Sequence, residues 1–218
     1  PLRRRTAGVA WLALVALLGV LAIGPAARLP MGVAGRLGSM LQGHPDMHKC
    51  PGVDMTVGSL GHGFSAGLGM ALAGKLRKKD YHVWVVIGDG ESQEGSIWEC
   101  AMATAKWKLD NFTVILDRNH LQNDFCVDDE MPIEPVADKW RAFGWHVDAI
   151  DGHRMEQVVA ALEAARERKG IPTLVLAETV KGKGVSFMEN VADWHGKAPC
   201  QAEADKALDE IRRCTCEI

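Results

Sequence analysis

Apolar residues along the chain gather in short runs, and longer stretches with helical spacing of apolar positions separate these runs. Four runs have strand length and are mostly apolar, which predicts buried parallel strands at Val83–Ile87, Phe112–Leu116, Trp145–Ile150 and Thr173–Ala177. Helical spacing predicts helices over Ser65–Lys79, Gly95–Lys108, Met155–Lys169 and Gln201–Arg213. This alternation predicts an α/β fold built on a doubly wound parallel sheet, in which ligands bind outside the carboxyl ends of the strands.

The N-terminal stretch has a different pattern. Three arginines, Arg3 to Arg5, precede an uncharged run from Ala7 to Ala27. Such a run is typical of a signal peptide or a short membrane anchor, and it also fits a buried helix or a segment foreign to the fold. From about Arg36 onward, glycine, aspartate and histidine appear at turns. We therefore predict an atypical segment over residues 1–33 and one domain over residues 34–218.

Composition narrows the possible classes of function. The 218 residues include 47% hydrophobic and 24% charged residues, with a net charge of −3. No basic, aromatic-rich stripe suggests nucleic-acid binding. Six cysteines include no CxxC pair and no His/Cys cluster with zinc spacing, which favours reduced thiols and a cytoplasmic location. We expect no membrane insertion, because the uncharged run is only marginally long enough to span a bilayer.

The most informative motif is Gly88-Asp89-Gly90, which follows the first predicted strand, together with Asn119 after the second. Because parallel strands end at one edge, we expect both side chains to reach the same crevice. Carboxylate and amide oxygens suit Mg²⁺, which usually shares its coordination with phosphates and water. The glycines would let the backbone approach a diphosphate at the following helix N-terminus. The alternative is that Asp89 only caps that helix.

This motif is the thiamine-diphosphate signature, and further segments extend the resemblance to transketolases over roughly residues 36 to 200. They are Gly43-His44-Pro45, Pro51-Gly52-Val53, Thr56-Val57-Gly58-Ser59-Leu60-Gly61, Gly90-Glu91-Ser92-Gln93-Glu94-Gly95, Asp151-Gly152-His153 and Asp193-Trp194-His195-Gly196. The segments Leu41–Met47 and Lys183–Asn190 resemble the split form, in which separate N- and C-terminal subunits make up the enzyme.

The resemblance implies a set of cofactor contacts. Asp89 and Asn119 would bind the metal through their side chains, and Leu121 through its carbonyl oxygen. The implied contacts to thiamine diphosphate come from these same strand ends, from a preceding glycine segment and from one histidine. They are Gly58, Ser59, Leu60, Gly88, Asp89, Gly90, Asn119, Leu121 and His195. The metal would be Mg²⁺, with Ca²⁺ or Mn²⁺ as substitutes.

Three residues are implied in catalysis. His44 would face the donor sugar, His195 would lie near the diphosphate and the substrate, and Glu94 would join a carboxylate network across a subunit interface. Each has a simpler alternative, since His44 could order a loop, Glu94 could be a carboxylate favoured by the helix dipole and His195 could be a structural histidine. Asp193 would orient His195 or its loop.

The implied activity is transfer of a two-carbon ketol unit from a ketose phosphate to an aldose phosphate. The chain would carry half of an active site. A C-terminal transketolase subunit with the pyrimidine-binding domain would complete it, in a dimer of heterodimers. Alternatives are another thiamine-diphosphate activity, such as deoxyxylulose-phosphate synthesis, and a non-catalytic homologue.

The resemblance has one gap. The Ser-Gly-His-Pro and Ser-Lys-Gly-His segments of transketolases have no counterpart upstream of His44, and residues 1–33 resemble nothing in the family. A shifted reading frame in a GC-rich gene, a divergent N-terminus and a leader or anchor are the three interpretations of that stretch. The missing histidines favour the non-catalytic alternative.

Overall fold

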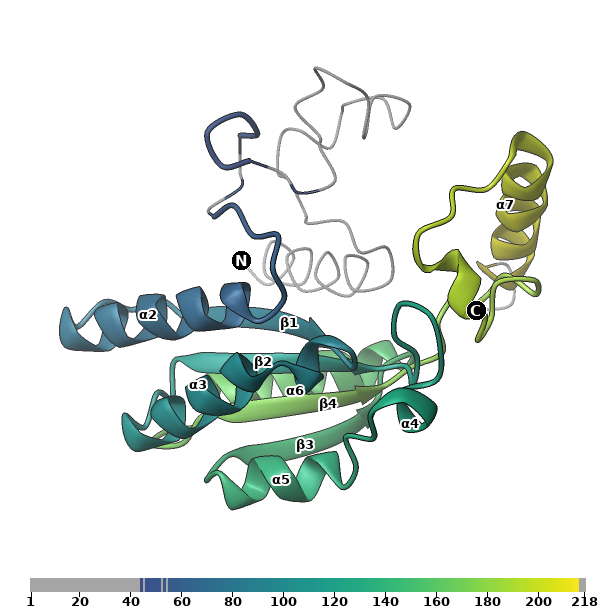
Figure 1. Cartoon of the computed structure of the whole chain (residues 1–218). Coiled ribbons are helices and arrows are strands. Elements are labelled where there is room, and N and C mark those ends of the chain that lie inside the picture. The colour runs from purple at the N-terminus through teal and green to yellow at the C-terminus, as the bar shows by residue number, and fades with distance from the viewer. Residues whose placement is uncertain (1–43, 45, 52, 54, 216–218) are drawn as a thin grey trace.

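The computed structural model describes residues 44, 46–51, 53 and 55–215, so the predicted segment 1–33 lies outside the described residues. Four parallel strands form one sheet in the order β1-β2-β4-β3 (Figure 1). They are β1 (Val83–Gly88), β2 (Phe112–Arg118), β3 (His146–Asp151) and β4 (Thr173–Glu178). All four predicted strands and the parallel arrangement are confirmed, with each boundary within two residues. Their predicted burial is correct for β2 and β4 only, because β1 and β3 are the edge strands and stay half-buried.

Helices cover the sheet unequally. One face carries α2 (His62–Leu76), α3 (Gly95–Lys106) and α5 (Val136–Ala142), and the other carries α6 (Met155–Glu167) over β3 and β4 (Figure 1). The chain moves one way across the sheet from β1 to β2 to β3 and returns from β3 to β4. Because βαβ crossovers are right-handed, the returning connection places its helix on the opposite face.

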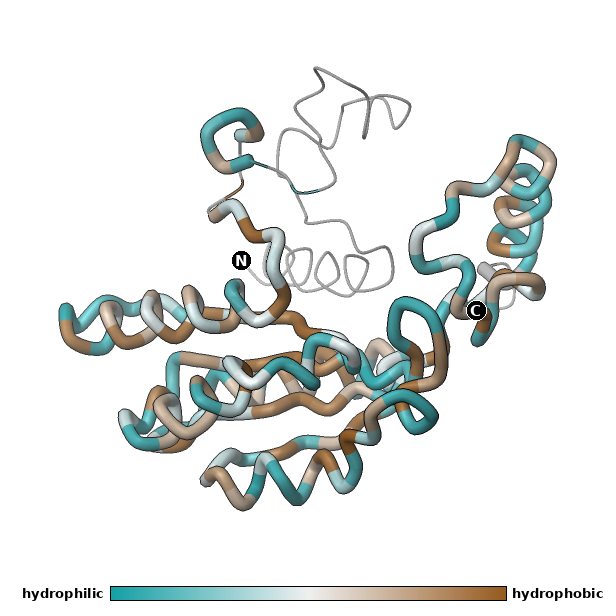
Figure 2. The backbone as a smooth tube through the Cα atoms, viewed as in Figure 1, coloured by the Kyte–Doolittle hydropathy of each residue, from teal (hydrophilic) through white to brown (hydrophobic). Residues whose placement is uncertain are grey.

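The main core lies between the sheet and α2, α3 and α5. Phe64 of α2 and Phe112 of β2 meet edge to face at 5.4 Å, and Trp140 of α5 packs at 4.8 Å from Trp145. These side chains are nearly fully buried. Figure 2 shows hydrophobic positions concentrated along the strands, as expected when both faces of a parallel sheet are apolar.

Some element boundaries differ from the predictions. The first helix runs from His62 to Leu76 rather than from Ser65 to Lys79, because Lys78 adopts a positive φ of 52° that ends it. The short helices α4 (Val127–Glu130) and α5, and the 3₁₀ turns η3 (Glu91–Gln93) and η4 (Ala192–His195), were not predicted. Elements of three to seven residues are too short for a periodic pattern to identify them.

The last predicted helix is present as α7 (Gln201–Thr215). It lies away from the sheet, beyond the arrowheads of the strands (Figure 1). Within the described residues, no helix combines the length and apolar character that a membrane span requires.

Strand register places the predicted site residues at one edge. Gly88 pairs with Asp117 across β1 and β2, and Glu178 pairs with both Arg118 and Asp151. All four strands therefore end within one residue step of each other. This edge carries the loops that follow Gly88, Arg118 and Glu178.

Candidate functional site

The turn after β1 places Asp89 at the centre of the carboxyl edge. Ile87 anchors the end of β1 in the core, and the Ser92 hydroxyl donates to the Gly88 carbonyl oxygen at 2.9 Å, which closes the turn into η3. Asp89 is 1% exposed. A carboxyl group at this depth costs free energy unless it is paired or binds a cation.

The two carboxylate oxygens of Asp89 have different surroundings. Oδ2 accepts the backbone N–H of His120 at 2.6 Å and lies 3.2 Å from Arg118 Nη1, as an ion pair without aligned hydrogen-bond geometry. Oδ1 is buried and has no hydrogen-bond partner. Burial raises the pKa of the Asp89 carboxyl to about 6, while the Arg118 guanidinium and the His120 N–H oppose that rise.

Asn119 and Leu121 lie in the loop that follows β2. The Asn119 side-chain oxygen accepts the Leu121 N–H at 3.0 Å, and its amide nitrogen donates to Asp117 Oδ2 at 3.2 Å. The Thr179 hydroxyl donates to the other Asp117 oxygen. The neighbouring His120 N–H is bonded to Asp89, so the structure brings the ends of β1 and β2 together as predicted.

These residues fit a hard divalent cation. The unpartnered Oδ1 of Asp89 is a buried anionic oxygen, and Asn119 offers an amide oxygen in the next loop. Among the described residues, no three His, Cys, Asp or Glu side chains gather around a possible metal position. A cation held by Asp89 would therefore complete its coordination with amide and carbonyl oxygens, water and phosphate, which is the habit of Mg²⁺.

The glycines of the turn play different parts. A Cβ on Gly88 would meet no atom within 4 Å, so open space lies beside this backbone. A Cβ on Gly90 would lie 3.1 Å from the Gln122 Cβ, so Gly90 permits the β2 loop to approach closely. Gly88 thus borders open space beside the turn, whereas Gly90 serves the packing of the two loops.

The segment before α2 reaches the same turn. The Gly61 N–H donates to Glu91 Oε1 at 2.9 Å, and Gly61 has a φ of 80° that a larger residue would adopt only with strain. Gly58, Ser59 and Leu60 are exposed just before this anchor, with Leu60 52% exposed. An exposed leucine next to the glycine that bonds Glu91 is suited to packing against a ring of a ligand.

The predicted catalytic residues lie in three separate loops. The His44 ring is 3.5 Å from the position of a Cβ on Gly58, which places it beside the Gly58–Leu60 segment. Glu94 is exposed at the start of α3, and its Cβ is 3.6 Å from the position of a Cβ on Gly61. Glu94 therefore shares the side of the site that holds Gly61.

His195 is exposed in η4, after β4. Its pKa is lowered by partial burial and by the charge of Lys181, against the opposing charge of Asp124. Lys181 follows β4 and Asp124 follows β2, so both charges that act on the imidazole belong to loops at the carboxyl edge of the sheet. The Trp194 indole N–H donates to the Phe187 carbonyl oxygen at 3.0 Å, which ties η4 to the preceding loop.

Arg118 and Glu134 control the surroundings of Asp89, and neither was predicted from the sequence. Arg118 is fully buried at the end of β2 and donates from Nε and Nη2 to Glu134 Oε1, at 3.1 and 2.9 Å. The only available signal was a charged residue directly before Asn119, and charged residues usually face solvent. Glu91, the partner of Gly61, was missed because its glycine partner lies thirty residues upstream.

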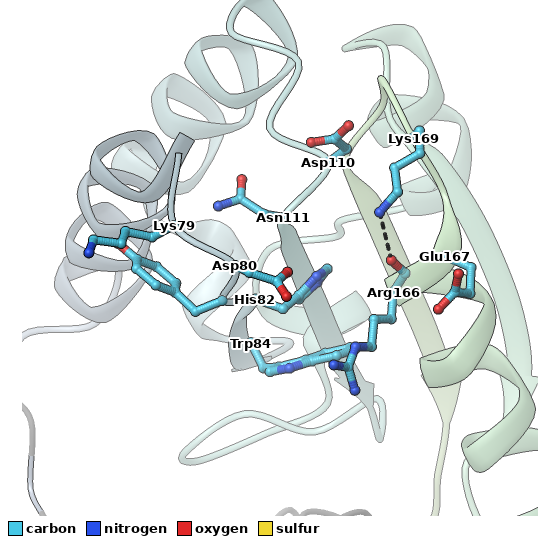
Figure 3. Close-up of a pocket in the computed structure, with 10 residues that line it drawn as sticks. Lys79, Asp80, His82, Trp84, Asp110, Asn111, Arg166, Glu167 and Lys169 are labelled. Carbon is cyan, nitrogen blue, oxygen red and sulfur yellow. Dashed lines mark hydrogen bonds between the residues drawn. The ribbon is translucent and has the colours of Figure 1, made fainter. Parts of the chain in front are cut away.

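A large cavity lies elsewhere in the molecule. It has a volume of about 520 Å³ and its lining includes His82, Trp84, Asp110 and Arg166 (Figure 3). These residues lie where β1 and β2 begin and where α6 ends, at the edge opposite Asp89. Its cations are balanced by acids, and ligands of doubly wound sheets bind at the other edge, so we do not assign the cofactor there.

Comparison with known proteins supports the fold and the cofactor class. Residues 33–212 match the family model described as the transketolase, thiamine diphosphate binding domain. The chain is 43% identical over 177 residues to one subunit of an apulose-4-phosphate transketolase from Phocaeicola vulgatus, covering 81% of this chain and 63% of that relative. It is 45% identical over 178 residues to a 6-deoxy-6-sulfo-D-fructose transketolase subunit from a Clostridium species, covering 82% and 65%.

Longer relatives match over the same part. Human transketolase is 38% identical over 181 residues, which cover 81% of this chain and 28% of that protein. The crystal structure of Campylobacter jejuni transketolase superposes with a TM-score of 0.78 at 30% identity, covering 83% of this chain and 29% of that one. The chain thus spans less than two thirds of the subunit relatives and less than a third of the single-chain transketolases.

Proposed function

This chain belongs to the family of transketolase thiamine-diphosphate-binding domains, and we propose that it binds thiamine diphosphate through Mg²⁺ as the N-terminal subunit of a ketol transferase. The observation that carries this proposal is the Asp89 Oδ1 atom, which is buried and has no partner at the carboxyl edge of the sheet. A divalent cation would neutralise this oxygen and bridge it to the diphosphate.

We assign the cofactor contacts as follows. Asp89, Asn119 and the carbonyl oxygen of Leu121 hold the metal, which is Mg²⁺ with Ca²⁺ or Mn²⁺ as substitutes. The open space beside Gly88 receives the diphosphate, and the exposed Leu60 packs against its rings. Bound thiamine diphosphate supplies the carbon nucleophile that the transfer of a ketol unit requires.

The remaining residues serve the substrate and the interface. His44 and His195 exchange protons with sugar hydroxyls, since imidazole titrates near neutral pH. The lowered pKa of His195 favours its neutral form, which can accept a proton. Glu94 joins carboxylates at the subunit interface. A C-terminal subunit contributes the pyrimidine-binding domain in a dimer of heterodimers that acts on sugar phosphates in the cytoplasm.

The subunit relatives support this assembly. Two of them are named as subunits of transketolases, and each matches this chain over most of its length. Their names give apulose-4-phosphate and 6-deoxy-6-sulfo-D-fructose, and the phosphate and sulfo groups in these names are anionic. We therefore propose a ketose donor with an anionic terminus.

Calorimetry on the purified chain tests the proposed function. Thiamine diphosphate should bind when Mg²⁺ is present and should show no measurable heat of binding when EDTA removes the metal, because the cation links two anionic partners. Thiamine without the diphosphate is the control and should not bind at either condition. Equal affinity with and without Mg²⁺ would contradict the metal assignment.

A substitution of His195 tests its proposed role in turnover. In the complex with its C-terminal partner, His195→Ala should lower kcat by roughly 100-fold, the lower range for loss of one acid–base group. The melting temperature should stay within about 2 °C, because surface substitutions rarely change stability by more than about 0.5 kcal/mol. The control is His62→Ala, at the exposed start of α2. His153→Ala is less suitable, because the His153 ring accepts the Val180 N–H at 2.7 Å and its loss would disturb the structure. A large loss of stability with unchanged kinetics would make His195 a structural residue.

A further inference from the structure

Arg118 is a fully buried charge at the end of β2. Its guanidinium is 1% exposed, and the strand that carries it is otherwise mostly apolar. Such a charge destabilises a fold unless its nitrogens are paired. The role of Arg118 therefore follows from the groups that its guanidinium contacts, which include Glu134 and Asp89.

Glu134 anchors one side of the guanidinium. Nε and Nη2 both donate to Glu134 Oε1, while Glu134 Oε2 accepts the N–H of Val136 at 2.8 Å. Val136 is the first residue of α5, so the carboxylate is fixed by the start of a helix. This arrangement prevents the guanidinium from turning away from the carboxyl edge of the sheet.

The third nitrogen of Arg118 reaches Asp89. Nη1 lies 3.2 Å from Oδ2, which also accepts the His120 N–H at 2.6 Å. One hydrogen bond and one ion pair therefore hold Oδ2 of Asp89, while Oδ1 has no hydrogen-bond partner. One cation between the carboxylates of Asp89 and Glu134 leaves a net negative charge for an incoming metal.

We propose that Arg118 is a positioning residue that makes Asp89 a one-oxygen metal ligand and thereby favours Mg²⁺ over Ca²⁺; this rests on the proposed function. With Oδ2 held by Arg118 and His120, only Oδ1 is offered to the cation. Mg²⁺ demands near-octahedral coordination, whereas Ca²⁺ accepts more oxygens and often takes both oxygens of a carboxylate. Glu134 contributes through Arg118, although it touches neither Asp89 nor the site.

A purely structural ion pair would behave differently. It would change stability when broken but leave the ratio of Mg²⁺ to Ca²⁺ affinities unchanged. In contrast, substitution of a residue that holds a metal ligand in place typically lowers metal affinity by about 10–100-fold. The selectivity ratio therefore separates the two roles.

The test uses Arg118→Lys and Glu134→Gln in the full chain. Arg118→Lys keeps the positive charge but lacks the planar guanidinium that contacts two carboxylates. Glu134→Gln removes the negative charge that anchors Arg118 but keeps an oxygen that can accept the Val136 N–H. Glu134 is half exposed, so this second variant should fold even if the first does not. The matched control is Arg168→Lys, which alters a 3.1 Å ion pair with Asp148 away from the site.

Affinities for Mg²⁺ and for Ca²⁺ are measured by calorimetry at saturating thiamine diphosphate, beside melting temperatures without cofactor. In both site variants the affinity for Mg²⁺ should fall about 10-fold or more. The affinity for Ca²⁺ should fall much less, because a freed Oδ2 can join the coordination of the larger ion. Arg168→Lys should keep the wild-type ratio. A wild-type ratio in both site variants would overturn the role of Arg118, whereas a wild-type chain that binds no Mg²⁺–thiamine diphosphate would overturn the proposed function and this inference with it.

Discussion

Asp89→Asn should weaken the Mg²⁺-dependent binding of thiamine diphosphate by more than about 100-fold, beyond the range usual for outer-shell partners. Asp89 provides a buried anionic oxygen without any other partner, and the amide of asparagine brings no charge to that position. Isothermal calorimetry at saturating Mg²⁺ measures the loss. We expect a large effect because Asp89 is buried, so that water cannot take the place of the lost carboxylate oxygen as a ligand.

Asparagine is a better replacement than alanine at this position. Its side-chain oxygen can still accept the His120 N–H and face Arg118. Alanine would leave the buried guanidinium with Glu134 and a 3.9 Å ion pair to Asp128, both on its other side. Breaking one partner of a buried pair costs up to about 3–5 kcal/mol, so Asp89→Ala should also lower the melting temperature. Asp110→Asn, at the opposite edge of the sheet, is the control and should bind cofactor normally. Unchanged affinity in Asp89→Asn would remove Asp89 from the metal site.

Adding a C-terminal transketolase subunit should raise ketol transfer by this chain by roughly 100-fold or more, the contribution of one well-placed acid–base group. The resemblance to transketolases implies that a glutamate beside the aminopyrimidine ring comes from the pyrimidine-binding domain across an interface. The described part of this chain leaves Gly58, Ser59 and Leu60 exposed, which suits a site that another surface closes. Closure would also exclude water from the reacting atoms.

The assay combines the purified chain, Mg²⁺, thiamine diphosphate and a ketose phosphate, with and without the second subunit. Asp89→Asn plus the second subunit is the control for activity carried by the partner preparation. Appreciable transfer by this chain alone would contradict the half-site proposal. Cofactor binding without turnover in the presence of the partner would favour the non-catalytic alternative.

Much of the fold was predictable because it depends on local pattern. Runs such as Phe112–Leu116 and Thr173–Ala177 are apolar at most positions, which is typical of a strand buried on both faces. Parallel strands then bring Asp89 and Asn119 to one edge without further information. The short helices α4 and α5 escaped prediction because their contacts with the rest of the fold, rather than their own periodicity, stabilise them.

The sequence by itself determined the parallel sheet, the edge that gathers Asp89 and Asn119, and the resemblance to a cofactor class, because strand pattern and a spaced motif are local properties. Only the tertiary structure decided how the two oxygens of Asp89 differ. Arg118 and Glu134 are sixteen residues apart, and Asp89 lies at the end of another strand. No local pattern records which buried charges meet, because a buried ion pair is set by the packing of distant elements and by the free energy of leaving a charge unpaired.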